Sequence, residues 1–281
     1  MEPLSVEVDG GAVHGWRYEG AGPPAVLLHG GPCISATYME PLVPLLEGVF
    51  EQILYQQRGL APSTAAEPYT VAANVADAAA VIDQAAGGRA WIVGHSWGGH
   101  LALHMLAAIP DRIAGAVIVD TLGAYLDVMQ EVGARLRAPL TEAERARVEE
   151  IEAREEAGAA SDEESMESFR IVWPSYFADP PAAPPMPDME IAVGPFTATF
   201  ASIAAEAEAG TLVSGLPRVP AGIPVVFLHG AGSPIPLRAS TETAALIPHA
   251  RVEIVERAGH FIWVEQPQRV RDAVAAALGG A

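Results

Sequence analysis

Short apolar runs alternate with amphipathic segments along most of the chain. Near its start, two segments that alternate apolar and polar residues flank Asp9-Gly10-Gly11, a turn sequence typical of a β-hairpin. Later apolar runs have the length and composition of buried strands. The expected strands are Leu4–Val8, Ala12–Tyr18, Ala25–Leu28, Gln52–Tyr55, Ala90–Val93, Ala114–Val119, Val225–Leu228 and Arg251–Val255.

Helical periodicity separates several of these runs. Apolar positions three and four residues apart predict helices over Val71–Ala85, Trp97–Ala108, Ser240–Ile247 and Pro267–Leu278. Alternation of strand and helix predicts an α/β fold, with a mostly parallel sheet that helices cover on both faces. The opening hairpin predicts an antiparallel edge.

The alternation stops between residues 122 and 215. Here Thr141–Glu156 is expected as a strongly charged, solvated helix, Asp179–Pro187 as a stiff proline-rich loop and Phe196–Ala209 as a further helix. We interpret residues 122–215 as a helical cap, inserted into a core domain that residues 1–121 and 216–281 form.

Charge and cysteine content narrow the possible partners. The chain has 281 residues, with 35 acidic against 16 basic side chains and a formal net charge of −19, which repels nucleic acid and anionic membranes. A lone cysteine, Cys33, excludes an intramolecular disulfide. No basic segment precedes an apolar one at the start, and the apolar runs are too short to cross a bilayer. We expect a cytoplasmic protein that acts on a small molecule, and the oligomeric state is open.

The sequence Gly94-His-Ser96-Trp-Gly98-Gly99 lies between a predicted buried strand and a predicted helix. Gly-x-Ser-x-Gly in this setting is typical of a nucleophile elbow, a strained turn that projects the serine from the sheet. The glycines are needed because side chains there would collide with the neighbouring strand or helix. Ser96 is therefore the candidate nucleophile, and an ordinary glycine-rich turn is the alternative.

An acyl-transfer site also needs donors for the oxyanion and a general base. The backbone N–H of Trp97 and that of Gly31, in the strand-end sequence His29-Gly30-Gly31-Pro32, are the expected oxyanion donors. His260 follows the last predicted strand, where the base belongs in the chain order Ser…Asp…His. We interpret Cys33, beside the oxyanion loop, as a packing residue.

These motifs, together with Tyr55-Gln-Gln-Arg58-Gly59 and Ala258-Gly-His260, resemble the α/β-hydrolase superfamily, most closely its proline-iminopeptidase-like members. The resemblance spans the chain outside residues 122–215. It implies an eight-stranded core, a helical cap and hydrolysis through an acyl-enzyme, with no metal or organic cofactor.

Two positions depart from that family pattern. Ser233 stands where these peptidases usually carry the triad acid, and a serine cannot supply the charge that stabilises an imidazolium. Gln56 replaces the acid of the Asp-Gln-Arg-Gly pattern. Asp120, at the end of the strand after the nucleophile helix, resembles the acid of superfamily members that place it there. We therefore predict a Ser96–His260–Asp120 triad, and a turn-capping aspartate is the alternative.

The sequence says less about the substrate and its binding pocket. Trp173, Tyr176 and Trp263 are candidates for an aromatic substrate pocket, although residues of this kind also pack in cores. The leading hypothesis is hydrolysis of a small ester or lactone. A proline-iminopeptidase-like aminopeptidase or amidase is the nearest rival. A cofactor-free dioxygenase, or a ligand-binding receptor on the same scaffold, also stays open.

Overall fold

The computed structural model describes residues 1–279 and contains an eight-stranded sheet with the strand order β1-β2-β4-β3-β5-β6-β7-β8. The first hairpin is antiparallel, β2 pairs antiparallel with β4, and all other neighbours are parallel. The α/β-hydrolase fold expected from sequence is confirmed. The strands are β1 Glu2–Val8, β2 Gly11–Tyr18, β3 Pro24–Leu28, β4 Glu51–Gln56, β5 Ala90–His95, β6 Ile113–Val119, β7 Val225–Gly230 and β8 Arg251–Val255.

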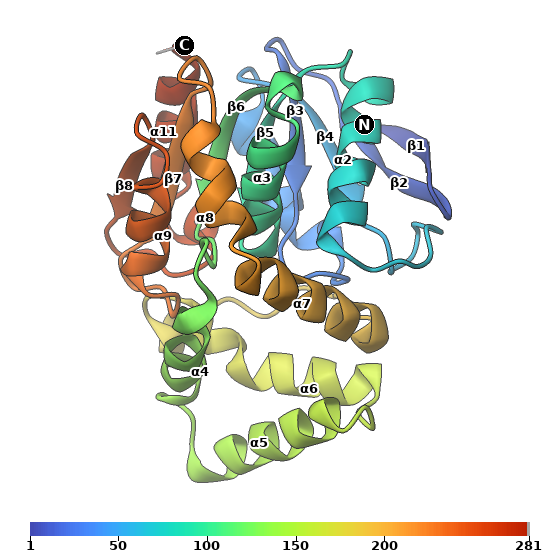
Figure 1. Cartoon of the computed structure of the whole chain (residues 1–281). Coiled ribbons are helices and arrows are strands. Elements are labelled where there is room, and N and C mark those ends of the chain that lie inside the picture. Colours follow the sequence, from blue (N-terminus) through green and yellow to red (C-terminus); the bar gives the residue numbers. More distant parts are fainter. Residues whose placement is uncertain (280–281) are drawn as a thin grey trace.

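Helices cover both faces of this sheet (Figure 1). They are α1 Val43–Leu46, α2 Val71–Ala85, α3 Trp97–Ala108, α4 Met129–Arg137, α5 Glu142–Glu156, α6 Asp162–Val172, α7 Val193–Glu208, α8 Thr211–Gly215, α9 Leu237–Ala244, α10 Ile262–Glu265 and α11 Pro267–Gly279. Among the short 3-10 helices, η1 spans Ala36–Leu42 and η4 spans Trp173–Tyr176.

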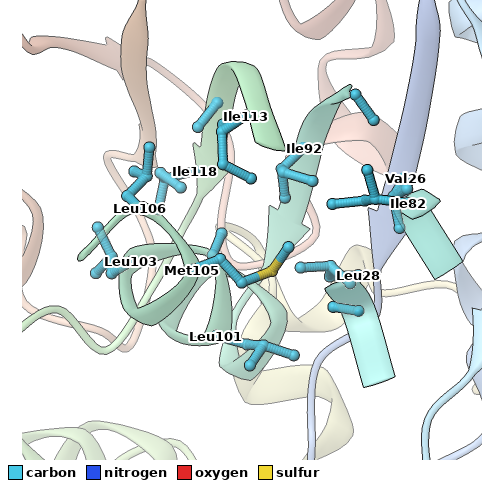
Figure 2. Close-up of a cluster of buried hydrophobic side chains, with 14 of the residues drawn as sticks. Val26, Leu28, Ile82, Ile92, Leu101, Leu103, Met105, Leu106, Ile113 and Ile118 are labelled. Carbon is cyan, nitrogen blue, oxygen red and sulfur yellow. The ribbon is translucent and has the colours of Figure 1, made fainter. Parts of the chain in front are cut away.

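The core has two layers because side chains alternate across each strand. Val26 and Leu28 of β3 pack with α2 and α3 on one face, whereas Ala25 and Leu27 pack with α1 and α11 on the other. Figure 2 shows part of the first layer, in which Met105 and other α3 side chains meet the strands. This close packing holds the carboxyl ends of the parallel strands in fixed positions.

One predicted helix is displaced. The pattern over Ser240–Ile247 predicted a helix there, but α9 begins at Leu237 and ends at Ala244. Pro236 stands at the N-cap, and the Ala245 N–H closes the last turn on the carbonyls of Thr241 and Thr243. Apolar Leu246 and Ile247 extend the pattern beyond the helix because they pack in the core from a following turn.

The stretch between β6 and β7 holds helices α4 to α8. Figure 1 shows α4, α5 and α6 at one end of the molecule, with α7 between them and the sheet. The last helix, α8, packs on α3, and Leu212 belongs to the main core. None of the helices in residues 1–279 is long and apolar enough to cross a membrane.

Candidate active site

Ser96 occupies the sharp turn between β5 and α3. Its backbone adopts φ +55° and ψ −118°, a positive-φ conformation that costs about 1–3 kcal/mol for a residue with a side chain. A Cβ on Gly98 would lie 2.0 Å from the Leu28 carbonyl oxygen, and one on Gly94 would lie 2.3 Å from the Gly98 oxygen. The motif glycines therefore allow strand, turn and helix to pack this closely, and Ser96 lines a cavity above the sheet.

Asp120 and His260 meet at the same edge of the sheet. Asp120 directly follows β6 and is fully buried, and its Oδ2 lies 2.6 Å from His260 Nδ1. Because an ionised carboxylate only accepts hydrogen bonds, His260 Nδ1 carries the proton and Nε2 is left to act as a base. His260 and Ser96 line the same cavity. The structure thus brings the three predicted triad residues to one site.

The loop of His260 is tied to η4, in the stretch between β6 and β7. The His260 N–H donates to the Tyr176 carbonyl over 2.6 Å, and a Cβ on Gly259 would lie 2.3 Å from that oxygen. Glycine is needed at this position because the two backbone segments approach so closely. The Ala-Gly-His motif therefore secures the histidine against η4.

Gly31 and Trp97, the predicted oxyanion donors, both line the cavity. Trp97 is the first residue of α3, so its N–H has no intrahelical acceptor. Gly31 adopts φ +50°, and a Cβ there would lie 2.3 Å from the Ile34 side chain. The neighbouring Gly30 N–H instead donates to the Tyr38 hydroxyl. This leaves Gly31 as the better placed donor of the two glycines.

Buried polar side chains hold the loop that follows β3, which carries Gly31. Gln56, the second departure from the family pattern, accepts from the Ala36 N–H at 2.8 Å and donates to the Ile34 carbonyl at 3.0 Å. An aspartate, which only accepts, could not make both bonds. Gln57 similarly donates to the His29 carbonyl and accepts from Trp97 Nε1. The two glutamines link the loop to β4 and to the helix that follows Ser96.

His95 supports His260 from the β5 side. The Tyr38 hydroxyl already accepts from Gly30, so its own proton is directed to His95 Nδ1 at 2.7 Å. His95 Nε2 then donates to the His260 carbonyl at 3.1 Å. Burial lowers the pKa of His95 well below its ordinary value and keeps it neutral. His95 therefore positions the His260 loop.

Cys33, in the loop that follows β3, is buried, and desolvation raises the pKa of its thiol to about 12. Its Sγ contacts the Arg58 carbonyl at 3.4 Å. A thiol held in its protonated form is a poor nucleophile, which agrees with a packing role.

The cavity above Ser96 has a volume of about 410 Å³ and is mainly apolar. Tyr176 lines it as expected. Trp173 and Trp263 do not belong to its described lining. Trp173 is buried with its Nε1 bonded to the Pro184 carbonyl, and Trp263 packs against Tyr38 and His95. Both side chains are thus packing residues, and both of their indole rings lie against Phe261.

About half of the lining comes from helices α4 to α7, whose lining residues the sequence analysis did not single out. Spacings of three and four residues on α4, α6 and α7 were the available signal, because they give each helix one apolar face. The apolar lining residues of these helices are Met129, Val132, Leu136, Phe169, Val172, Phe196 and Phe200.

A polar region on α4, α5 and α6 completes the lining. Arg137 of α4 forms an ion pair with Glu152 of α5, and Glu155 accepts from the Ser165 hydroxyl. Within residues 1–279, no cluster of three or more His, Cys, Asp or Glu side chains is arranged to hold a metal ion.

Comparison with known proteins relates this geometry to a family. A model described as the alpha/beta hydrolase family matches residues 25–273. Lipase LipV of Mycobacterium tuberculosis (strain ATCC 25618 / H37Rv) is 43% identical over 77 residues, 26% of this chain and 29% of that protein. The chain spans less than half the length of the curated relatives that it matches first, 29% and 44% for two of them.

Solved structures match over nearly the whole chain. VinJ superposes with a TM-score of 0.75 and 23% identity, covering 99% of this chain and 98% of that one. Proline iminopeptidase from Mycobacterium smegmatis superposes with a TM-score of 0.70 and 20% identity, covering all of both chains. At such identities these likenesses show the fold alone. With the family match over most of its length, the chain belongs to the alpha/beta hydrolase family.

Proposed function

We propose that the protein is a serine hydrolase that cleaves a small-molecule carboxylic ester or lactone through a Ser96–His260–Asp120 triad. The observation that carries this proposal is the 2.6 Å contact between His260 Nδ1 and Asp120 Oδ2, at the edge of the sheet where Ser96 occupies its strained turn. Asp120 holds His260 in the tautomer that presents Nε2 as a base.

In the first half-reaction, Ser96 Oγ attacks the substrate carbonyl carbon while His260 Nε2 takes the hydroxyl proton. The N–H groups of Gly31 and Trp97 hold the oxyanion, which carries the charge that develops on the carbonyl oxygen. As the tetrahedral intermediate collapses, the acyl–oxygen bond breaks and His260 returns the proton to the departing alkoxide. An ester gives a free alcohol and an acyl-enzyme on Ser96, whereas a lactone gives a single acyl-enzyme whose opened chain carries the new hydroxyl.

In the second half-reaction, water attacks the acyl carbon with His260 again as base. The same donors hold the second oxyanion, the bond to Ser96 Oγ breaks, and the proton returns to Ser96. The mainly apolar cavity supports a substrate with an apolar acyl or alcohol part. The name of LipV, a lipase, agrees with an ester as the bond that is cleaved.

A second candidate is an aminopeptidase or amidase with the same triad. It is favoured by Glu152 and Glu155, whose side chains line the cavity and would attract a substrate ammonium. Arg137 and Ser165 already engage these carboxylates, so the ester or lactone stands first. The structural likeness to a proline iminopeptidase keeps a prolyl amide among the substrates to test.

The test compares a short-chain aryl ester, an aromatic lactone and a prolyl arylamide, each with the native protein and with Ser96→Ala. Ester or lactone turnover that disappears in Ser96→Ala supports the proposal. Prolyl-amide turnover as the dominant activity would replace it with the second candidate. Turnover that survives in Ser96→Ala, together with oxygen uptake, would instead indicate a cofactor-free dioxygenase that uses only His260 and Asp120. Tight binding without turnover would indicate a receptor.

A further inference from the structure

The Asp120 carboxylate receives hydrogen bonds on both of its oxygens. Oδ2 accepts from His260 Nδ1 at 2.6 Å and from the Ser233 hydroxyl at 2.5 Å. Oδ1 accepts from the Gly230 N–H at 3.2 Å. All of these groups are buried, so little water is available to replace any donor that is removed.

The direction of the Ser233 proton follows from its second partner. The Ile235 N–H donates to Ser233 Oγ at 3.0 Å and occupies one of the hydroxyl lone pairs. The carboxylate next to it can only accept. The Ser233 proton therefore points at Asp120 Oδ2, the same oxygen that His260 uses.

This arrangement depends on which strand carries the acidic residue. Asp120 approaches His260 from the end of β6, whereas Ser233 lies just beyond β7, at the position where the resemblance places the acid. We propose that Ser233 is a positioning residue, whose hydroxyl orients the Asp120 carboxylate toward His260 and shares its Oδ2. The kinetic consequence rests on the proposed function, whereas the arrangement of the Asp–His pair does not.

Sharing Oδ2 has a definite electrostatic effect. A hydroxyl that donates to a carboxylate stabilises the ionised form and takes up part of its charge, so less charge remains to stabilise a protonated His260. Removing the hydroxyl should therefore raise the pKa of His260. The same change frees the carboxylate to rotate about its one remaining backbone contact, which should loosen the orientation of the imidazole.

Other groups that face this pair stay in place when Ser233 is changed. The His95 ring of β5 lies 4.4 Å from that of His260, between centroids, and the Tyr176 ring of η4 lies 5.2 Å away. His229 Nδ1 of β7 is 3.3 Å from Asp120 Oδ1, and Arg135 of α4 donates to the Ser233 backbone carbonyl. A difference between native protein and variant therefore reports on the hydroxyl itself.

The experiment is an NMR titration of the histidine side chains in the full chain, with the His260 signal assigned by its loss in His260→Gln. In Ser233→Ala we expect the pKa of His260 to rise by about half a unit to one unit. Ser233→Thr, which keeps the hydroxyl, should return it toward the native value. Ser63→Ala is the matched control, because this buried serine bonds to the backbone N–H of His14 and the backbone carbonyl of Gln56 and has no hydrogen bond to Asp120, His229 or His260.

Kinetics give the second readout. With any substrate that the protein hydrolyses, kcat in Ser233→Ala should fall about threefold to tenfold, and the acidic limb of the kcat/KM profile should move up with the His260 pKa. An unchanged His260 titration in Ser233→Ala would overturn the proposal, as would a Ser63→Ala shift of equal size. If Ser96→Ala kept full turnover, the proposed function would fail, and the titration would still decide the role of Ser233.

Discussion

The carboxylate of Asp120 and the imidazole of His260 are 2.6 Å apart although 140 residues separate them in the chain. Asp120 directly follows β6, and His260 lies in the loop between β8 and α10. Since β6, β7 and β8 are consecutive parallel neighbours in the sheet, their carboxyl ends share one edge. A loop from the edge strand can therefore reach back over β7 to an acid on β6.

Asp120→Asn tests this contact. The amide cannot supply the negative charge and favours the wrong histidine tautomer, so we expect kcat to fall by about 10³- to 10⁴-fold while KM changes little. Asp127→Asn, at an exposed aspartate that pairs with Arg238, is the control and should keep native turnover. Near-normal kcat in Asp120→Asn would contradict the acid assignment.

The double variant Asp120→Asn/Ser233→Asp tests whether the position after β7 can still carry the acid. Ser233 Oγ lies within hydrogen-bond distance of Asp120 Oδ2, so a carboxylate placed there is near the same imidazole. We expect turnover to recover by roughly tenfold or more over Asp120→Asn alone, in proportion to the restored charge. No recovery, in a protein that melts like Asp120→Asn, would mean that the loop directs a side chain at 233 away from His260.

Gly98→Ala tests the packing of the elbow. Because the added Cβ would lie 2.0 Å from the Leu28 carbonyl oxygen, strand and helix must separate. We expect the free energy of unfolding to fall by about 3 kcal/mol or more, measured by urea denaturation. Gly194→Ala is the matched control: this exposed helical glycine has nothing within 4 Å of the added methyl. That variant should be neutral or slightly stabilised.

The buried histidine pair on α3 predicts a pH dependence of stability. Burial lowers the pKa of His100 to about 4 and that of His104 to about 3. A hydrogen bond of 3.2 Å joins the Nε2 atoms of the two rings. In the unfolded chain both titrate near 6.5, so below that pH the unfolded state binds more protons. The two histidines therefore do not reduce the free energy of unfolding above about pH 6.5, and they reduce it progressively as the pH falls toward 4.

The expected loss is about 1.4 kcal/mol per pH unit for each such histidine. His104→Gln keeps a polar partner for His100 and removes one titrating group. Urea unfolding at pH 7, 6 and 5 should therefore show a shallower fall in this variant than in the native protein. Parallel stability curves for the two proteins would show that His104 does not contribute.

Phe200→Ala tests the cavity as the substrate pocket. Phe200 of α7 lines the cavity and packs against Phe196, with the ring centroids 4.8 Å apart and the rings tilted. Removing its ring should shift kcat/KM toward longer acyl chains by about tenfold, the usual effect of one or two methylenes in an apolar pocket. Leu237→Ala, at a partly exposed apolar residue outside the cavity lining, should leave chain-length preference unchanged.

The strands, the elbow and the sheet edge could be predicted from sequence because each depends on short-range chemistry. Buried parallel strands need unbroken apolar runs, and the turn at Ser96 needs glycines at 94 and 98. The absence of a carboxylate at position 233 also points to Asp120, since only a few strands end close enough to His260 to place an acid beside it.

The cavity and the hydrogen-bond partners depended on tertiary structure. Trp173 and Trp263 have the aromatic side chains that often line substrate pockets. Whether such a side chain lines a cavity or packs in the core is decided by neighbours that are distant in the sequence. By sequence, Ser233 is only a position without a charge. Its hydrogen bond to Asp120 follows from the fold, which brings the Ile235 N–H and the Asp120 carboxylate to its hydroxyl. Local patterns determine elements and motifs, whereas burial and hydrogen-bond direction belong to contacts that form only when distant strand ends meet.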